Sequence, residues 1–224
     1  MTDIKTDQAI EVTENGPYHV TGAVPLVRVR KTPGERGSFS GWEPYETLET
    51  EDEYWLCRCG QSTNKPFCTG MHEKVNFDGT ETAPTDTNAQ RAQILGGTKV
   101  TVKDDRGICA HAAFCSNAAT NVWKAAKKTD DDAELAETVV GMVRNCPSGA
   151  LTVEIDGKPA EQNLMPEIWV LENGNYVVRG AVPITRSDGQ PIEMRNRMAL
   201  CRCGGSKNKP LCDGTHAEIG FTDG

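Results

Sequence analysis

CRCGGSKNKPLCDGTH, at residues 201–216, repeats the string CRCGQSTNKPFCTGMH of residues 57–72. All three cysteines and the final histidine keep their places, at a constant shift of 144 positions. Thiolates and imidazoles are the groups that bind soft and borderline metals, so a duplication that preserves them indicates two copies of one binding site. The eight candidate ligands are Cys57, Cys59, Cys68 and His72 in the first copy and Cys201, Cys203, Cys212 and His216 in the second.

The duplication extends beyond the cysteine string. NGPYHVTGAVPL at 15–26 matches NGNYVVRGAVPI at 173–184, but here the shift is 158 positions. The first copy therefore carries about fourteen extra residues, which we place in the glycine- and proline-bearing segment KTPGERGSFSGWEP. We expect a tandem repeat, with one copy at residues 15–80 and the other at residues 167–224.

Both copies have the residue pattern of β-strands. A further strand is expected before each cysteine string, at EYWLC (53–57) and RMALC (197–201). Hydrophobic residues at even spacing line one face of a strand. Such residues are Tyr18, Val20, Val24 and Leu26 in the first copy and Tyr176, Val178, Val182 and Ile184 in the second.

The segment between the copies has a different residue pattern, with a linker, strands and a helix. TETAPTDTNAQ (80–90) is typical of a linker, whereas TKVTVKDD (98–105) and LTVEI (151–155) have the composition of strands. DDAELAETVVGMVRN (131–145) starts with acidic residues and continues with apolar residues at helical spacing, which predicts a helix. The sequence therefore predicts an inserted α+β domain at residues 92–156, small enough to need a metal or disulfides to support its core.

Composition limits the partners and the compartment. The chain of 224 residues has a net charge of −8 and a pI near 5.1, which argues against nucleic acid or an anionic membrane as a partner. It has no apolar run of the roughly 20 residues that span a bilayer and no signal-peptide pattern, so we expect a cytoplasmic protein. Nine cysteines in a reducing compartment favour metal binding over disulfides.

The spacing C-x-C-x8-C-x3-H leaves two kinds of metal site open. Zinc binds sets of three cysteines and one histidine, but its common local pair is C-x2-4-C rather than C-x-C. A [2Fe–2S] cluster needs two ligands on each of its two irons, which adjacent cysteines and a more distant Cys–His pair supply. Ligand chemistry favours the iron–sulfur cluster, and zinc is the alternative.

The second string resembles the CDGSH iron–sulfur domain, the family of mitoNEET. The resemblance covers C-x-C-x2-S-x3-P-x-C-D-G-x-H, and residues 212–216 nearly spell the signature as Cys-Asp-Gly-Thr-His. It implies that each string binds one [2Fe–2S] cluster through its three cysteines and its histidine. The first copy departs at Thr69, where the family has an aspartate that is not a ligand. Binding is therefore expected to persist there, with an altered potential or lability.

The double-motif members of this family imply the overall architecture. They fold as monomers with an internal pseudo-two-fold axis. The resemblance therefore implies an α+β protein with two β-rich CDGSH modules in a β-sandwich and a small α+β domain inserted between them. We expect the folded unit to be a monomer.

Three further cysteines, Cys109, Cys115 and Cys146, lie in the inserted segment. They form the bacterial ferredoxin pattern with Ala112 in place of the second cysteine. The stretch resembles the small single-cluster ferredoxins, and three thiolates suffice for a [3Fe–4S] cluster, which lacks the iron without a ligand. A [4Fe–4S] cluster with another fourth ligand and an empty site are the alternatives. His111 is expected to be a surface or hydrogen-bonded imidazole rather than a ligand.

These sites favour electron transfer through two [2Fe–2S] clusters and a ferredoxin-type cluster. The sequence contains no Ser–His–Asp or phosphate-loop pattern, so we expect a carrier rather than an enzyme, without catalytic residues. One alternative is cluster transfer or redox and pH sensing, because a histidine-ligated cluster is released more easily. A zinc-bound interaction scaffold is another. The expected partner is an unidentified redox protein or cluster acceptor.

Overall fold

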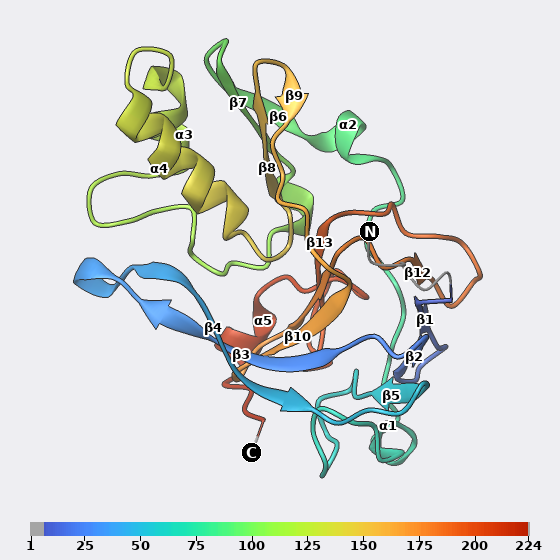
Figure 1. Ribbon diagram of the computed structural model, residues 1–224. Helices are drawn as coiled ribbons and strands as arrows, with labels where there is room; N and C mark the ends of the chain where they lie inside the picture. The colour runs from blue at the N-terminus through green and yellow to red at the C-terminus, as the bar shows by residue number, and fades with distance from the viewer. Residues whose placement is uncertain (1–6, 224) are drawn as a thin grey trace.

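Both repeats contribute strands to each of two sheets in the computed structural model, which describes residues 7–223 (Figure 1). The first sheet has the order β12-β1-β2-β5 and the second has the order β13-β11-β10-β3-β4. The strands of the first sheet are β12 (Ile184–Thr185), β1 (Ala9–Val12), β2 (Tyr18–Thr21) and β5 (Tyr54–Leu56). Those of the second are β13 (Arg197–Leu200), β11 (Tyr176–Arg179), β10 (Glu167–Leu171), β3 (Leu26–Pro33) and β4 (Phe39–Leu48).

The repeats exchange strands. In the first sheet β12 of the second repeat pairs in parallel with β1, and Ile10 lies opposite Ile184. In the second sheet β3 of the first repeat pairs in parallel with β10, and Ile168 lies opposite Leu26. The two pairings are equivalent at the shift of 158 positions, so each repeat completes the sheet of the other.

One hydrophobic core joins the two sheets. Ile10 and Val20 from the first sheet and Ile168 and Val178 from the second belong to the same buried cluster. The predicted strand faces are confirmed, because the even-spaced residues at 18–26 and 176–184 are all buried. Strand β1 was not predicted. It precedes residue 15, where we placed the start of the first copy, although its counterpart β10 lies inside the second.

The inserted domain packs two helices on a four-stranded sheet, and a second hydrophobic cluster forms its own core. Its predicted strands and helix are confirmed, and the Asp132 side chain accepts a hydrogen bond from the Leu135 amide at the helix start (2.9 Å). The elements are β6 (Gln93–Gly96), β7 (Val100–Asp104), β8 (Leu151–Ile155), β9 (Lys158–Pro159), α3 (Val122–Ala125) and α4 (Ala133–Arg144). Two 3₁₀ turns complete it, η2 (Arg106–Ile108) and η3 (Ala126–Lys128).

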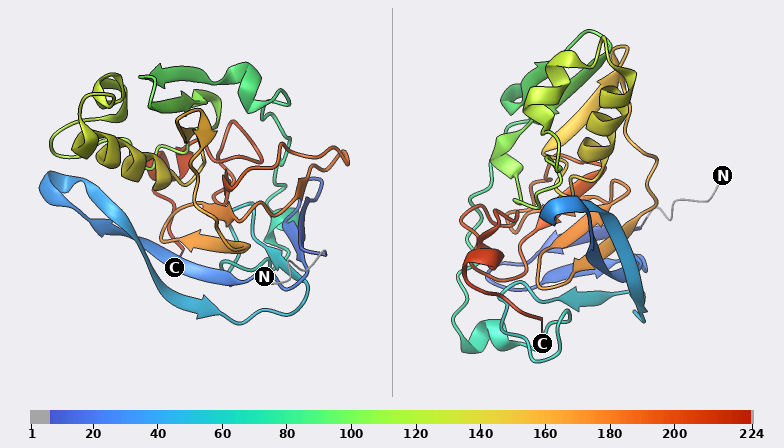
Figure 2. Two further views of the ribbon diagram at one scale, coloured as in Figure 1. Left: turned by 45° about the horizontal axis from the view of Figure 1, so that its top comes forward. Right: turned by 90° about the vertical axis from the view of Figure 1, so that its left-hand side faces the viewer.

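The extra residues of the first copy form an arm that reaches the inserted domain. Strands β3 and β4 are antiparallel and are joined by the 3₁₀ turn η1 (Glu35–Gly37), and the hairpin extends beneath α4 (Figures 1 and 2). Trp42 of the arm donates a hydrogen bond to the Asn145 carbonyl (3.0 Å), and its ring lies 4.5 Å from that of Phe114. The insertion thus has a role that the second copy lacks, which is to hold the inserted domain.

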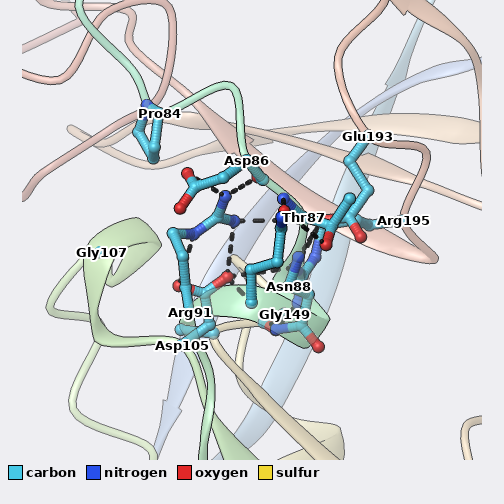
Figure 3. Close-up of polar contacts among 12 residues, drawn as sticks. Pro84, Asp86, Thr87, Asn88, Arg91, Asp105, Gly107, Gly149, Glu193 and Arg195 are labelled. Atoms are coloured by element: carbon cyan, nitrogen blue, oxygen red, sulfur yellow. Dashed lines mark hydrogen bonds and ion pairs between the residues drawn. The ribbon is translucent and has the colours of Figure 1, made fainter.

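An ion-pair network on the linker also holds the inserted domain (Figure 3). The linker contains a short helix, α2 (Asn88–Arg91), and Asp105 of the inserted domain is fully buried behind it. The Asp105 carboxylate accepts hydrogen bonds from Arg91 (2.7 Å) and from Arg195 of the second repeat (3.3 Å). Burial would raise the pKa of Asp105, but the Arg91 and Asn88 hydrogen bonds and the arginine charges outweigh it and hold this pKa below its usual range.

The second repeat receives the carboxyl end of helix α4. Arg197 is buried and donates hydrogen bonds to the carbonyls of Val143 (2.8 Å), Arg144 (2.8 Å) and Cys146 (2.7 Å). A cation at this end of a helix binds its unsatisfied carbonyls and complements the helix dipole.

The two remaining helices, α1 (Met71–Lys74) and α5 (Thr215–Glu218), are short. None of the helices in residues 7–223 is long and apolar enough to cross a membrane.

Candidate iron–sulfur sites

Each CDGSH-like string brings its four predicted ligands together as two pairs. In the first copy Cys57 and Cys59 follow β5, with their Sγ atoms 3.8 Å apart. Cys68 precedes helix α1, and its Sγ lies 3.4 Å from Nδ1 of His72. The corresponding distances in the second copy are 4.0 Å for Cys201 and Cys203 and 3.3 Å for Cys212 and His216.

These distances fit a cluster with two irons better than a single zinc ion. Two ligands on one tetrahedral ion, with bonds of about 2.0–2.3 Å, lie roughly 3.5–3.8 Å apart. The Cys–Cys pairs (3.8 and 4.0 Å) and the Cys–His pairs (3.4 and 3.3 Å) lie close to this spacing, and in residues 7–223 no group of three or more Cys, His, Asp or Glu is arranged around one ion. Pairs that are spaced for one metal each, without merging into a single site, are what a [2Fe–2S] cluster requires.

Hydrogen bonds to the cysteine sulfurs favour the thiolate form that binds metal. Backbone amides donate hydrogen bonds to one sulfur in each pair, as Gln61 does to Cys59 and Gly70 to Cys68. The equivalent donors in the second copy are Gly205 and Gly214. The hydrogen bond between the two thiols lowers the pKa of Cys57 to about 6 and raises that of Cys59. Each C-x-C pair therefore gives up one proton readily, as metal binding by thiolates demands.

Two tyrosines connect each string to the other repeat. The hydroxyl of Tyr18 donates to the carbonyls of Cys201 (2.8 Å) and Pro210 (3.1 Å) in the second copy. The hydroxyl of Tyr176 contacts the carbonyls of Cys57 (2.9 Å) and Pro66 (3.0 Å) in the first. A hydroxyl has one proton, so it is shared between the two carbonyls. The repeat identified both tyrosines as strand residues, but their function at the opposite site was missed.

The arginine inside each C-x-C pair was also missed as a structural residue. Arg58 and Arg202 are each 1% exposed, which is rare for this residue type. Arg58 donates to the carbonyls of Thr13 and Gly79 and lies over the rings of Tyr18 and Phe77. Arg202 makes the equivalent contacts with Leu171, Tyr176 and Phe221. The identical arginine in both strings was the available signal.

The two strings approach each other at their C-x-C pairs. Cys59 and Cys203 form an isolated antiparallel backbone bridge. Gly60 and Gly204 follow them with φ values of 77° and 78°, and a Cβ on either would lie within 2.6 Å of the carbonyl oxygen of the opposite cysteine. Only glycine fits a positive φ at so close an approach, so the glycines allow the two sites to be adjacent.

The residue after the third cysteine distinguishes the copies. The Asp213 carboxylate accepts hydrogen bonds from the amides of Lys207 (2.8 Å) and Thr215 (3.1 Å) and from the Thr215 hydroxyl. Thr69, its counterpart, makes one side-chain hydrogen bond to Ser62 (3.2 Å). The loop before α5 is therefore more strongly fixed than the loop before α1.

The three cysteines of the inserted domain converge on one cavity of about 170 Å³. Cys109, Cys115 and Cys146 line it together with Ala112, the residue that stands in place of the pattern's second cysteine. Burial raises the pKa of Cys115, and the neighbouring charges of Cys109 and Cys146 add to the effect. Three cysteines that line one cavity are a donor set that fits an iron–sulfur cluster with three protein ligands.

The two histidines outside the repeated strings, His19 and His111, have different surroundings. His19 stacks on Trp55 at 4.1 Å and hydrogen-bonds Glu53 on the surface of the first sheet. His111 is exposed and packs its side chain against Gly214 of the second string. It also lines the cavity of the central cysteines, and only its contact with the second string had no signal in the sequence.

Two family models match the chain. The model described as "Iron-binding zinc finger CDGSH type" matches residues 15–73 and 173–217, and the model described as "Divergent 4Fe-4S mono-cluster" matches residues 95–156. No curated protein matches. The chain is therefore a tandem CDGSH iron–sulfur protein with a divergent ferredoxin-type domain inserted between its two CDGSH modules.

Proposed function

We propose that this protein is an electron carrier that holds a [2Fe–2S] cluster in each CDGSH module and a third cluster in the inserted domain. The observation that carries the proposal is the pairing of ligands, which are spaced for one metal within a pair but do not converge as a set of four. When bound, such a cluster accepts and donates single electrons. The zinc-scaffold alternative requires the convergence of all four ligands that the pairs lack.

The chain's own contribution is to hold the three sites close together. The C-x-C pairs are buried, and the contact between Cys59 and Cys203 brings the two CDGSH sites together. The central cysteines lie beside the second module, since Ala110 packs in one buried cluster with Cys212 and Arg197 donates a hydrogen bond to the Cys146 carbonyl. We assign the protein no catalytic residue, and its partner is a redox protein or a cluster acceptor.

The reciprocal contacts support an internal pseudo-two-fold axis through a β-sandwich. The exchanged strands, the crossed tyrosines and the buried arginines all occur in pairs related by the repeat shifts. A chain that already contains both halves of such an arrangement has no need of a second copy. The folded unit is therefore a monomer, which light scattering tests directly.

The central cluster is of the [3Fe–4S] type on this proposal. Ala112 offers no ligand, and the Asp104 carboxylate at the same cavity is engaged by Arg106 and Trp123 (2.9 Å each). The matching family model is named for a [4Fe–4S] cluster, which here would need a fourth ligand from outside the three cysteines.

Metal analysis and electron paramagnetic resonance test the proposal together. We expect about seven irons per chain with matching sulfide, a signal from the oxidised central cluster, and signals from both CDGSH clusters after reduction. About eight irons would favour a central [4Fe–4S] cluster, and about four would mean an empty central site. Abundant zinc in a colourless protein would refute the iron–sulfur assignment.

A further inference from the structure

The two CDGSH sites have the same ligands but different surroundings. Gly70 and Gly214 stand at equivalent positions, each with a positive φ (76° and 90°) just before the short helix that carries the histidine. A Cβ on Gly70 would meet nothing within 4 Å. A Cβ on Gly214 would lie 3.0 Å from Cβ and 3.2 Å from Cδ2 of His111. His111 of the inserted domain therefore sits directly on the second string.

Several contacts hold His111 in this place. Its neighbour Ala110 belongs to a buried cluster with Ala199 and Cys212 of the second module. Asn208 of the second string donates a hydrogen bond to the Gly107 carbonyl (2.8 Å). His111 itself has a φ of 54°, a conformation that residues other than glycine rarely adopt. In this conformation the side chain lies against Gly214.

Access from solvent differs accordingly. Cys212 is 2% exposed, whereas its counterpart Cys68 is half-buried. His216 lines a cavity of about 460 Å³ whose walls include Lys31, Trp42 and His111. His72 lines an open hollow formed by its own repeat, among residues that include Glu73 and Asp78. Figure 1 shows the same contrast, with α1 at the far end of the molecule from the inserted domain and α5 beside the β3–β4 arm.

We propose that the inserted domain caps the second CDGSH site through the contact of His111 with Gly214, and that the first CDGSH site is the one open to exchange with molecules in solution. The proposal rests on the function proposed above. It deepens that function by giving the two alike sites different tasks. The second site keeps its cluster next to the central one, and the first site meets the redox partner or the cluster acceptor.

Cluster loss to excess EDTA at neutral pH, followed by visible absorbance, tests the cap. Cys212→Ser protein reports on the first site and Cys68→Ser protein on the second, after subtraction of the central cluster's absorbance, which the Cys68→Ser/Cys212→Ser double variant measures. We expect the second cluster to be lost about tenfold more slowly, the factor that an opening free energy of about 1.4 kcal/mol produces. Equal rates at the two sites would overturn the proposal.

Gly214→Ala and Gly70→Ala form a matched pair of variants. Both place a side chain at a positive φ, so both carry the same backbone strain, but only the first pushes against His111. We expect Gly214→Ala to accelerate loss from the second site about tenfold more than Gly70→Ala accelerates loss from the first. In a His111→Gly background, Gly214→Ala should accelerate loss from the second site no more than Gly70→Ala accelerates loss from the first, because only the backbone strain remains once the methyl meets no side chain. Equal effects of the two glycine substitutions would refute the cap.

Amide hydrogen exchange distinguishes failure of the cap from failure of the proposed function. Residues 211–217 should exchange more slowly than residues 67–73, and Gly214→Ala should remove this difference. This measurement does not depend on which metal the protein holds. A zinc-bound protein with a protected second string would therefore refute the iron–sulfur function and retain the cap. An iron-loaded protein in which residues 211–217 and 67–73 exchange equally fast would refute the cap and retain the iron–sulfur function.

Discussion

In the first CDGSH module strand β3 runs for eight residues and turns back into β4, whereas its counterpart β12 in the second module has two residues. The tyrosines at equivalent positions make the same pair of hydrogen bonds in opposite directions. Contacts around the ligands are thus made twice, and contacts with the inserted domain are made once. Position 197 shows the difference in one residue, since Arg197 binds the end of α4 and its equivalent is Glu53, an exposed residue.

The comparison shows how a duplicated binding site accommodates a third domain. The ligand geometry constrains both strings equally, so the residues that support it remain paired. The inserted domain can contact only one string, so the residues that hold it have diverged between the copies. The first copy supplies the β3–β4 arm, and the second copy supplies Arg195 and Arg197, which bind the inserted domain. Substitutions at paired positions of the two repeats should therefore change stability equally. A substitution of a residue that holds the inserted domain should change stability much more than a substitution at the equivalent position of the other repeat.

Arg197→Ala should have the largest effect. It leaves the Glu161 carboxylate without its partner (2.5 Å) and removes the donor to three carbonyls at the end of α4. Breaking one partner of such a buried pair costs about 3–5 kcal/mol, measured by chemical denaturation. Glu53→Ala at the equivalent position is the control and should change stability by about 0.5 kcal/mol or less. Similar losses in both variants would break the distinction between docking and paired residues.

Asp105→Asn should cost about 3 kcal/mol and change the response to acid. Because the folded-state pKa of Asp105 lies below its unfolded value, its contribution is fully present above about pH 4 and is lost as pH falls through the folded pKa. Denaturation curves from pH 7 to pH 3 should show a smaller acid-induced loss in the variant than in the unmodified protein. Asp131→Asn, at an exposed position of the same domain, is the control. Parallel pH profiles for the unmodified protein and Asp105→Asn would exclude this role.

Tyr18→Phe and Tyr176→Phe should be equally destabilising. Each leaves two buried carbonyls of the opposite string without a donor, at a cost of about 1–2 kcal/mol. Tyr45→Phe serves as the control because Tyr45 is 43% exposed. Equivalent positions should give stability losses that agree within about 0.5 kcal/mol. A difference of more than about 1 kcal/mol between Tyr18→Phe and Tyr176→Phe would argue against the pseudo-two-fold relation.

Thr69→Asp and Asp213→Thr should have small effects of opposite sign. A carboxylate at Asp213 accepts three hydrogen bonds ahead of α5, and the loss of such a cap costs about 1 kcal/mol. Thr69→Asp should stabilise the first string by about 0.5 kcal/mol, since the new carboxylate can accept from the backbone before α1. The effects of the two substitutions are measured as the thermal stability of each variant and the reduction potential of each site. Changes of the same sign in both variants would show that residues 69 and 213 do not account for the difference between the loops.

The ligands and most strands could be predicted because their signals are local. The repeated string picked out the eight candidate ligands, which the structure brings together in pairs, and the even spacing at Tyr18 and Val20 predicted a buried strand face that the structure confirms. Strand β1, with the sequence AIEV, is too short to have a signal of its own and exists because β2 and β12 flank it. The exchange of β3 and β12 and the contact of His111 with Gly214 join residues far apart in sequence, which no periodicity encodes.

The crossed contacts have a consequence for synthesis of the protein. Residues 57–72 leave the ribosome well before β11, which carries Tyr176, and β12, which completes the sheet next to β1. The first CDGSH module therefore cannot reach its final form before β11 and β12 have been synthesised. Its ligands are translated first, but they are expected to receive iron and sulfide only after the second module has emerged, so the earlier site matures together with the later one.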